Sequence, residues 1–177
     1  DVSPDAAGVS RRLDTPLVDR IEELARLMTA FTEAADGRSC RLVTELGVAG
    51  IGKSRLAAEL LTSVRGEATV LGGRCLPYGE GITFWPVVEA IRRAGGADAI
   101  TSALRGGKDD QAAAAALRGL LEPTPTPDGS DEIFWAVRRF LEALAAERPL
   151  VVCFEDIHWG EPTFLDLLEY LAGFIRD

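Results

Sequence analysis

The residues best suited to chemistry in this chain form one octapeptide, Gly47-Val48-Ala49-Gly50-Ile51-Gly52-Lys53-Ser54. It fits the pattern G-x-x-x-x-G-K-[ST], a glycine-rich loop that surrounds the phosphates of ATP or GTP. Its glycines let the backbone turn so that successive N–H groups point inward and form a concave anion site. Lys53 brings a positive charge to the terminal phosphates, and Ser54 offers a hydroxyl to Mg²⁺. The alternative is a glycine-rich turn with an exposed lysine.

The segments on either side of the octapeptide favour the first interpretation. Arg41–Leu46 has the composition of a strand, and Arg55–Leu61 has that of a helix. The helix that begins near Lys53 adds the positive end of its dipole to the anion site. The chain has only two lysines, Lys53 and Lys108, and otherwise uses arginine. A lysine kept at this position indicates a compact point charge that the planar arginine fork cannot replace.

A second candidate group is the acidic pair Glu155-Asp156, which directly follows the apolar run Leu150–Phe154. A continuous apolar run is typical of a strand covered on both faces, as in parallel sheets. Acids at the carboxyl end of such a strand lie where open α/β sheets bind ligands. The pattern predicts a Walker B element, in which one acid reaches the water shell of Mg²⁺ and the other orients the attacking water. The alternative is an acidic cap on the helix that begins near Pro162.

Three residues near these motifs have two open interpretations each. Arg74 ends a predicted strand, where it either reaches phosphate or is a solvated arginine, and we favour the second. Trp159 is either a coupling element or a lid packed over the strand end, and we favour packing. His158 is either a sensor of the γ-phosphate or a capping residue.

The elements that position these groups follow from periodicity and turn residues. Asp19 and Glu22 resemble a capping box, and Ser130 or Asp131 can cap a later helix. Strands alternating with helices predict an α/β layered fold. The expected order is a helix from about Ile21 to Asp36-Gly37, strand Arg41–Leu46, helix Arg55–Leu61, strand Ala68–Cys75, helices Phe84–Ala94, Ala97–Arg105, Asp109–Leu121 and about 130–148, strand Leu150–Phe154, and a final helix from Pro162.

Composition limits the class of protein. The 177 residues are enough for one domain or one and a half, and 47% of them are hydrophobic. A net charge of −9 argues against a broad nucleic-acid surface or an anionic membrane as a direct partner. The three cysteines suit neither a metal site nor a disulfide framework. No signal peptide or membrane span is evident, so we expect a reducing, cytoplasmic location.

Four motifs together resemble one family. They are Pro16–Leu24, Gly47–Leu56, Gly73–Gly81 and Glu155–Thr163. The chain is similar to the STAND-type, AAA-like P-loop ATPase modules of large bacterial regulators. Such modules lie behind class III adenylate or guanylate cyclase domains, or inside LuxR-type and SARP-type transcriptional regulators. Asp19 stands where the family has glycine, and Glu155 stands where the first acid is commonly aspartate.

The resemblance implies a three-layer P-loop NTPase fold with a parallel sheet. Residues 1–16 would be a flexible lead-in, and residues 17–177 the N-terminal part of the ATPase domain. The family's sheet continues with further strands and a helical lid, so the chain would be truncated after the Walker B strand and its helix. One missing strand would lie between the phosphate-loop strand and the Walker B strand. We therefore expect self-association as a homo-oligomer or marginal stability.

The resemblance also assigns roles. ATP and Mg²⁺ are the implied cofactors, and an output domain in cis, a cyclase or DNA-binding domain, is the implied partner. Nucleotide would be bound by Val18, Arg20, all eight residues of the octapeptide and Arg55; Mg²⁺ by Ser54 and Glu155; and catalysis would involve Lys53, Glu155 and Asp156. The leading hypothesis is a nucleotide switch that hydrolyses ATP slowly. The alternatives are a scaffold that binds nucleotide without significant hydrolysis and, last, a small-molecule kinase.

Overall fold

A computed structural model describes residues 20–77, 83–122 and 129–174. It has an α/β fold with a small parallel sheet, which confirms that part of the sequence-based prediction. The calls that involve Val18 and Asp19 lie outside the described residues. The elements are α1 (Ile21–Gly37), α2 (Lys53–Val64), β1 (Thr69–Arg74), α3 (Trp85–Ala94), α4 (Ala97–Ala103), α5 (Lys108–Leu121), α6 (Ser130–Glu147), β2 (Leu150–Glu155), the 3₁₀ turn η1 (Ile157–Trp159) and α7 (Pro162–Phe174).

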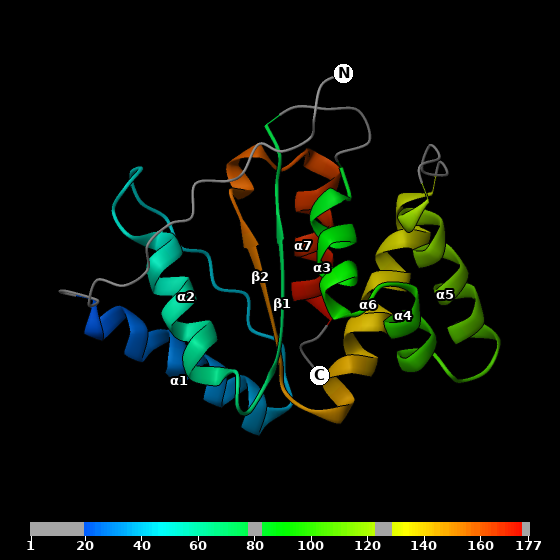
Figure 1. Cartoon of the computed structure of the whole chain (residues 1–177), viewed down its shortest axis with the longest axis horizontal. Helices are drawn as coiled ribbons and strands as arrows, with labels where there is room; N and C mark the ends of the chain where they lie inside the picture. The colour runs from blue at the N-terminus through cyan, green and yellow to red at the C-terminus, as the bar shows by residue number, and fades with distance from the viewer. Residues whose placement is uncertain (1–19, 78–82, 123–128, 175–177) are drawn as a thin grey trace, which may run out of the picture.

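Two parallel strands form the sheet at the centre of the molecule. Their register runs from Thr69 opposite Leu150 to Arg74 opposite Glu155. Helices α1 and α2 lie on one side of the strands, and α3 and α7 lie on the other, with α4, α5 and α6 beyond them (Figure 1). Because the strands are parallel, both deliver their last residues to the same edge of the sheet.

Local sequence explains most helix boundaries. Pro86 lies in the first turn of α3, where its missing N–H costs nothing, and Gly95 ends that helix. The expected cap on α6 is wrong. The helix begins at Ser130 with Gly129 as its N-cap, and no side chain caps it. Asp131 nevertheless lies in the first turn, where a negative charge favours the helix dipole.

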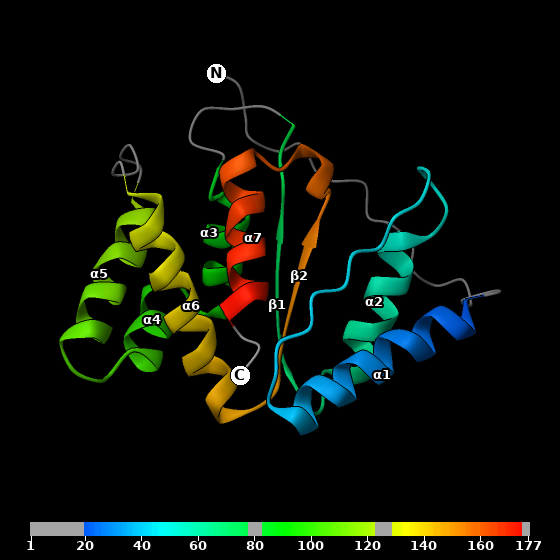
Figure 2. The ribbon, with the colours of Figure 1, turned by 180° about the vertical axis from the view of Figure 1, so that it is seen from behind.

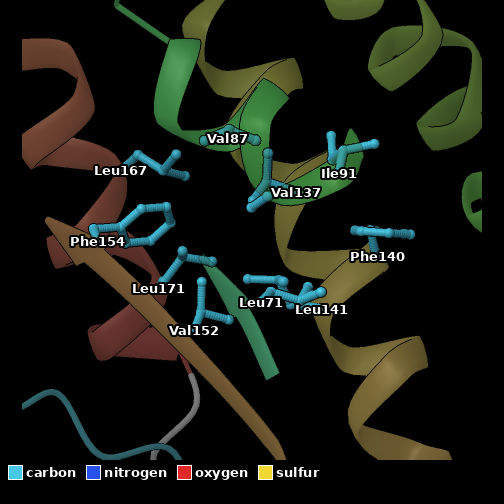
Figure 3. Close-up of a pocket in the computed structure, with 11 residues that line it drawn as sticks. Leu71, Val87, Ile91, Val137, Phe140, Leu141, Val152, Phe154, Leu167 and Leu171 are labelled. Atoms are coloured by element: carbon cyan, nitrogen blue, oxygen red, sulfur yellow. The ribbon is translucent and has the colours of Figure 1, made fainter. Parts of the chain in front are cut away.

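The core fills the space between the sheet and helices α3, α6 and α7. Leu71 of β1, Ile91 of α3, Val137 of α6, and Phe154 and Leu167 face one another there (Figure 3). The space left between the lining residues is about 10 Å³ and entirely apolar. That volume is close to the minimum for a single water molecule, and the lining offers no polar partner. This region is therefore packed core rather than a ligand site.

The strand expected at residues 41–46 is absent from the structure. This segment has no regular secondary structure and forms no ladder with β2. It runs between α2 and β2 in both views of the ribbon (Figures 1 and 2). Leu42 and Leu46 are 57% and 85% exposed. A strand requires a hydrogen-bonded neighbour, and among the described residues β2 pairs with β1 alone, so strand composition by itself was insufficient.

The apolar strand β2 forms where it was expected, but its burial differs from the prediction. All six residues of Leu150–Glu155 are half-buried, whereas a strand covered on both faces would be buried throughout. Phe154 contacts the ring of Phe164 in α7 with 5.2 Å between centroids, so one face of β2 is packed. Within the described part of the chain, the edge of β2 away from β1 has no paired strand.

None of the described helices combines the length and apolar character needed to cross a membrane.

An ion pair between α5 and α6 gives a prediction about stability. Arg139 of α6 donates to Asp110 of α5, and the Gly106 amide donates to the other carboxylate oxygen at 2.8 Å. These bonds, that of Arg139 first, hold the pKa of Asp110 below its ordinary value of 3.8. We expect Asp110→Asn to lower the urea midpoint at pH 7. A carboxyl group whose pKa is lower in the folded than in the unfolded state stabilises the fold at pH values above the unfolded pKa. The difference in urea midpoint between wild type and Asp110→Asn should therefore narrow as the pH falls below about 3.8.

Asp109→Asn is the matched control for that measurement. Asp109 lies in the same first turn of α5, so its replacement removes a similar favourable interaction with the helix dipole. It has no hydrogen bond to Arg139 within the described residues. If Asp110→Asn costs as much stability at pH 3 as at pH 7, the ion pair does not act as described.

Candidate functional site

The backbone of the octapeptide turns into α2 through two glycines with positive φ. Gly50 has φ 80°, and Gly52, the N-cap of α2, has φ 99°. L-residues with side chains rarely adopt these conformations. The amides of Gly50, Gly52 and Lys53 donate to no backbone carbonyl of the described residues. These donors, together with the positive end of the α2 dipole, form a local anion-binding surface.

The ammonium group of Lys53 folds back over the same loop. Its Nζ donates to the carbonyl oxygen of Gly47 at 2.7 Å and to that of Val48 at 3.1 Å. The positive charge therefore lies at the loop and not out in solvent. Val48 and Ile51 are exposed, and Ser54 is half-buried in the first turn of α2.

Arg55, the last predicted nucleotide-binding residue after the loop, points along α2 instead. Its Nη2 lies 3.4 Å from Glu59 Oε2 one turn later. Its buried Nη1 has no hydrogen-bond partner among the described residues. The structure thus gives Arg55 a helix ion pair and does not test its role toward nucleotide.

Arg20 is brought directly to the loop, although the two are far apart in sequence. Its Nη2 donates to the Ile51 carbonyl at 3.0 Å, and its Nη1 pairs with Glu23 at the same distance. Glu45 lies in the same environment. Burial raises the pKa of Glu45, and the charges of Arg20 and Lys53 oppose that rise. Arg20 therefore connects the start of α1 to the loop.

The two acids lie where β2 ends. Glu155 is the last residue of β2, and Asp156 adopts the left-handed conformation with φ 56° at the start of η1. This conformation is uncommon for a residue other than glycine, although Asp tolerates it better than most. Glu155 is still in register with Arg74 of β1, whereas the change of direction at Asp156 ends the regular alternation of the strand.

Arg74 holds both acids, which the sequence analysis did not foresee. Its Nη2 lies 2.6 Å from Glu155 Oε2, and its Nε lies 3.6 Å from Asp156 Oδ2. The hydrogen bond to Glu155, and after it the charges of Glu155, Asp156 and Glu89, raise the pKa of Arg74. The only sequence signal was an arginine at the end of a strand, and its pairing depended on strand order.

Two residues shortly after the acids, His158 and Trp159, are exposed. Trp159 is 49% exposed and contacts the ring of His158 with 5.0 Å between centroids. The favoured interpretation of Trp159 as a packed lid is therefore wrong.

Burial, with the charge of Asp156 adding to it, raises the pKa of Cys75 to about 11. Its thiol is protonated at neutral pH and is not a nucleophile.

The loop and the acids lie toward the same end of the sheet, at the N-terminus of α2 and after β2 (Figures 1 and 2). Burial and the charges of both Glu155 and Glu45 raise the pKa of Cys153, so the segment leading into the loop shares its environment with the end of β2. The Lys53 ammonium bonds to carbonyls of its own loop, and the Glu155 carboxylate bonds to Arg74. The roles assigned to these residues stay predictions.

The residues present fit a nucleoside triphosphate with Mg²⁺. A Cβ added at Gly50 or Gly52 would meet no atom within 4 Å, so the inner surface of the loop is open. Within the described residues, no group of three or more His, Cys, Asp or Glu side chains could hold a metal alone. Mg²⁺ commonly takes one or two carboxylates together with phosphate oxygens and waters, and the acids after β2 could supply that share.

Comparisons with known proteins give a family match. A family model described as an AAA ATPase domain matches residues 16–174. An uncharacterized protein of Rhizobium meliloti (strain 1021) is 32% identical in an alignment of 183 positions, gaps included, and this alignment covers 93% of the chain. The match covers 18% of that relative, so the chain spans less than a fifth of its length. No solved structure matches the chain.

Proposed function

The chain belongs to the AAA ATPase domain family, and from this premise we propose that it is a Mg·ATP-binding nucleotide switch that hydrolyses ATP slowly. The observation that carries the proposal is the loop of residues 47–54. There the amides of Gly50, Gly52 and Lys53, which donate to no backbone carbonyl of the described residues, converge with the start of α2 and the Lys53 ammonium. We place it in a bacterial signal-transduction or transcriptional regulator. The much longer relative, of which this chain matches 18%, supports the idea of an output domain in cis.

The fold that we propose has more strands than the two-stranded sheet of the described residues. Residues 17–177 would be the N-terminal part of a three-layer P-loop domain, and residues 1–16 a lead-in. Among the described residues, the outer edge of β2 and the segment 41–46 have no strand partner. Both features support this proposal, because a complete sheet would use both. The same two features support self-association, since unpaired strand edges invite pairing with another chain.

Each residue of the site has a proposed task. The amides of Gly50, Gly52 and Lys53, and the Lys53 ammonium, hold the terminal phosphates. To reach them, the Lys53 ammonium exchanges its bonds to the Gly47 and Val48 carbonyls for bonds to phosphate oxygens. We propose that three further residues contribute to the nucleotide site: Val18, Arg20 and Arg55. Arg20 would do so by holding the Ile51 carbonyl of the loop, to which it already donates.

The acids carry the catalytic part of the proposal. When bound, Mg²⁺ would neutralise charge on the phosphates. Ser54 and Glu155 would be its protein ligands. Asp156 accepts the proton of the attacking water or orients that water. Hydrolysis should be slow because Arg74 engages both carboxylates.

A scaffold that binds nucleotide without significant hydrolysis is the second candidate. The same Arg74 contacts favour it, because carboxylates held by a guanidinium are less available to a metal ion and to water. Calorimetry with Mg·ATP, combined with phosphate release under single-turnover conditions, separates the two candidates. Binding with release supports the slow switch, and binding without release supports the scaffold. No heat from folded protein at millimolar Mg·ATP would contradict both.

Asp156→Asn tests the assigned catalytic role. We expect affinity for Mg·ATP to stay within about threefold, while phosphate release falls about 10²-fold or more, because an amide cannot accept the proton. Asp166→Asn, at an exposed acid of α7, is the control and should release phosphate at the wild-type rate. Unchanged release in Asp156→Asn would move the role to another residue.

A further inference from the structure

Arg74 lies beside both acids and contacts the carboxylate that is proposed to bind the metal. It is the last residue of β1, directly opposite Glu155 in the sheet. We propose that Arg74 is a positioning residue that competes with Mg²⁺ for the Glu155 carboxylate, with its guanidinium also held beside Asp156, and so sets the Mg²⁺ concentration at which Glu155 takes up the metal. The inference rests on the proposed function, since it concerns the metal that accompanies ATP.

The competition follows from which oxygen atoms the guanidinium holds. Nη2 takes Oε2 of Glu155 at 2.6 Å, and Nε lies 3.6 Å from Oδ2 of Asp156. One planar group thus spans one oxygen from each carboxylate, a geometry that the arginine fork provides and a lysine ammonium does not. Mg²⁺ approaches its oxygen ligands to about 2.0–2.1 Å. A metal on Glu155 would either take Oε2 from the guanidinium or share the carboxylate with it. In both cases the two positive charges lie close together and repel, so each weakens the binding of the other.

The backbone of Arg74 is fixed, so the exchange is confined to its side chain. Its amide donates to Glu89 Oε2 of α3 at 2.8 Å, and the next amide, that of Cys75, donates to the Glu155 carbonyl at 3.0 Å. Arg93 holds the other oxygen of Glu89 at 2.6 Å. β1 and β2 therefore keep Arg74 and Glu155 opposite each other whichever partner the carboxylate takes.

The side chain of Arg74 has room to leave. It is 50% exposed, so displacing it exchanges a half-exposed ion pair for solvent and buries no charge. The carboxylate of Glu89 lies next to the Arg74 backbone and offers the displaced guanidinium a nearby negative charge. A half-exposed pair of this kind is weak enough for a divalent cation to displace, yet strong enough to shift the required concentration measurably.

The test is a Mg²⁺ titration of the 177-residue protein with ATP, read by calorimetry or by a fluorescent ATP analogue. We expect Arg74→Gln to lower the Mg²⁺ concentration at half-saturation about two- to fivefold, the range corresponding to one half-exposed ion pair. Affinity for ATP in EDTA should stay within about twofold, because Arg74 touches the acids and not the loop. Arg74→Lys keeps the charge without the fork and should give a smaller shift.

Two controls make the result decisive. Arg93→Gln removes a positive charge from the same network without contacting either acid, and should leave the Mg²⁺ midpoint unchanged. Thermal unfolding checks that each variant is folded. An unchanged or raised midpoint in folded Arg74→Gln would overturn the inference, as would an equal shift in Arg93→Gln. Wild-type protein that binds no ATP in EDTA or with Mg²⁺ would instead overturn the proposed function, and this inference with it.

Discussion

Replacing Lys53 by alanine is expected to lower affinity for Mg·ATP by about 100-fold or more. The ammonium lies at the loop, bonded to the Gly47 and Val48 carbonyls, and is the side-chain charge placed to meet the β- and γ-phosphates. A hydrogen bond to a charged group is worth about 1.5–3 kcal/mol, and Lys53 would make at least two such bonds to phosphate. Calorimetric titration with Mg·ATP measures the loss.

The chain offers a matched control, because Lys108 is its only other lysine. Lys108 is exposed at the start of α5, far from the loop in the ribbon (Figure 1). Lys108→Ala should bind Mg·ATP as tightly as the wild type. Equal affinity of Lys53→Ala and wild type would mean that residues 47–54 are only a glycine-rich turn.

Replacing Gly73 by alanine should destabilise the fold by more than about 3 kcal/mol. An added Cβ would lie 2.0 Å from the carbonyl oxygen of Pro86 and 2.7 Å from its carbonyl carbon. Both are backbone atoms of α3, so no rotamer change relieves the overlap. The strand and helix must separate, and overpacking of this kind typically costs 1–3 kcal/mol even where only side chains move. Urea unfolding should show a strongly lowered midpoint.

Gly119→Ala is the control for the effect of adding a methyl group. Gly119 lies inside α5, and a Cβ there meets nothing within 4 Å. Alanine is the better helix former by up to about 1 kcal/mol, so this variant should be at least as stable as the wild type. If Gly73→Ala unfolds at the wild-type midpoint, the close approach of β1 to α3 is not a feature of the folded protein.

The pairing of the acids shows how far sequence reasoning reached. The apolar run before Glu155 predicted a strand and placed both acids at its carboxyl end, which is confirmed. The sequence contained no sign of their partner, because Arg74 and Glu155 are 81 positions apart. Only the parallel register of β1 and β2 brings them together. A contact decided by strand order is not encoded in any local pattern.

By itself, the sequence determined the features that depend on neighbouring residues. The loop of residues 47–54, its entry into α2 through Gly52, and the strand at 69–74 all follow from local conformational preferences and hydrophobic runs. The tertiary structure decided what depends on distant partners. Residues 41–46 have the composition of a strand, but no strand of the described part of the chain pairs with them. Arg74 contacts the two acids because β1 and β2 are neighbours in the sheet. Backbone pairing and ion pairs are satisfied between segments, so their outcome belongs to the whole fold.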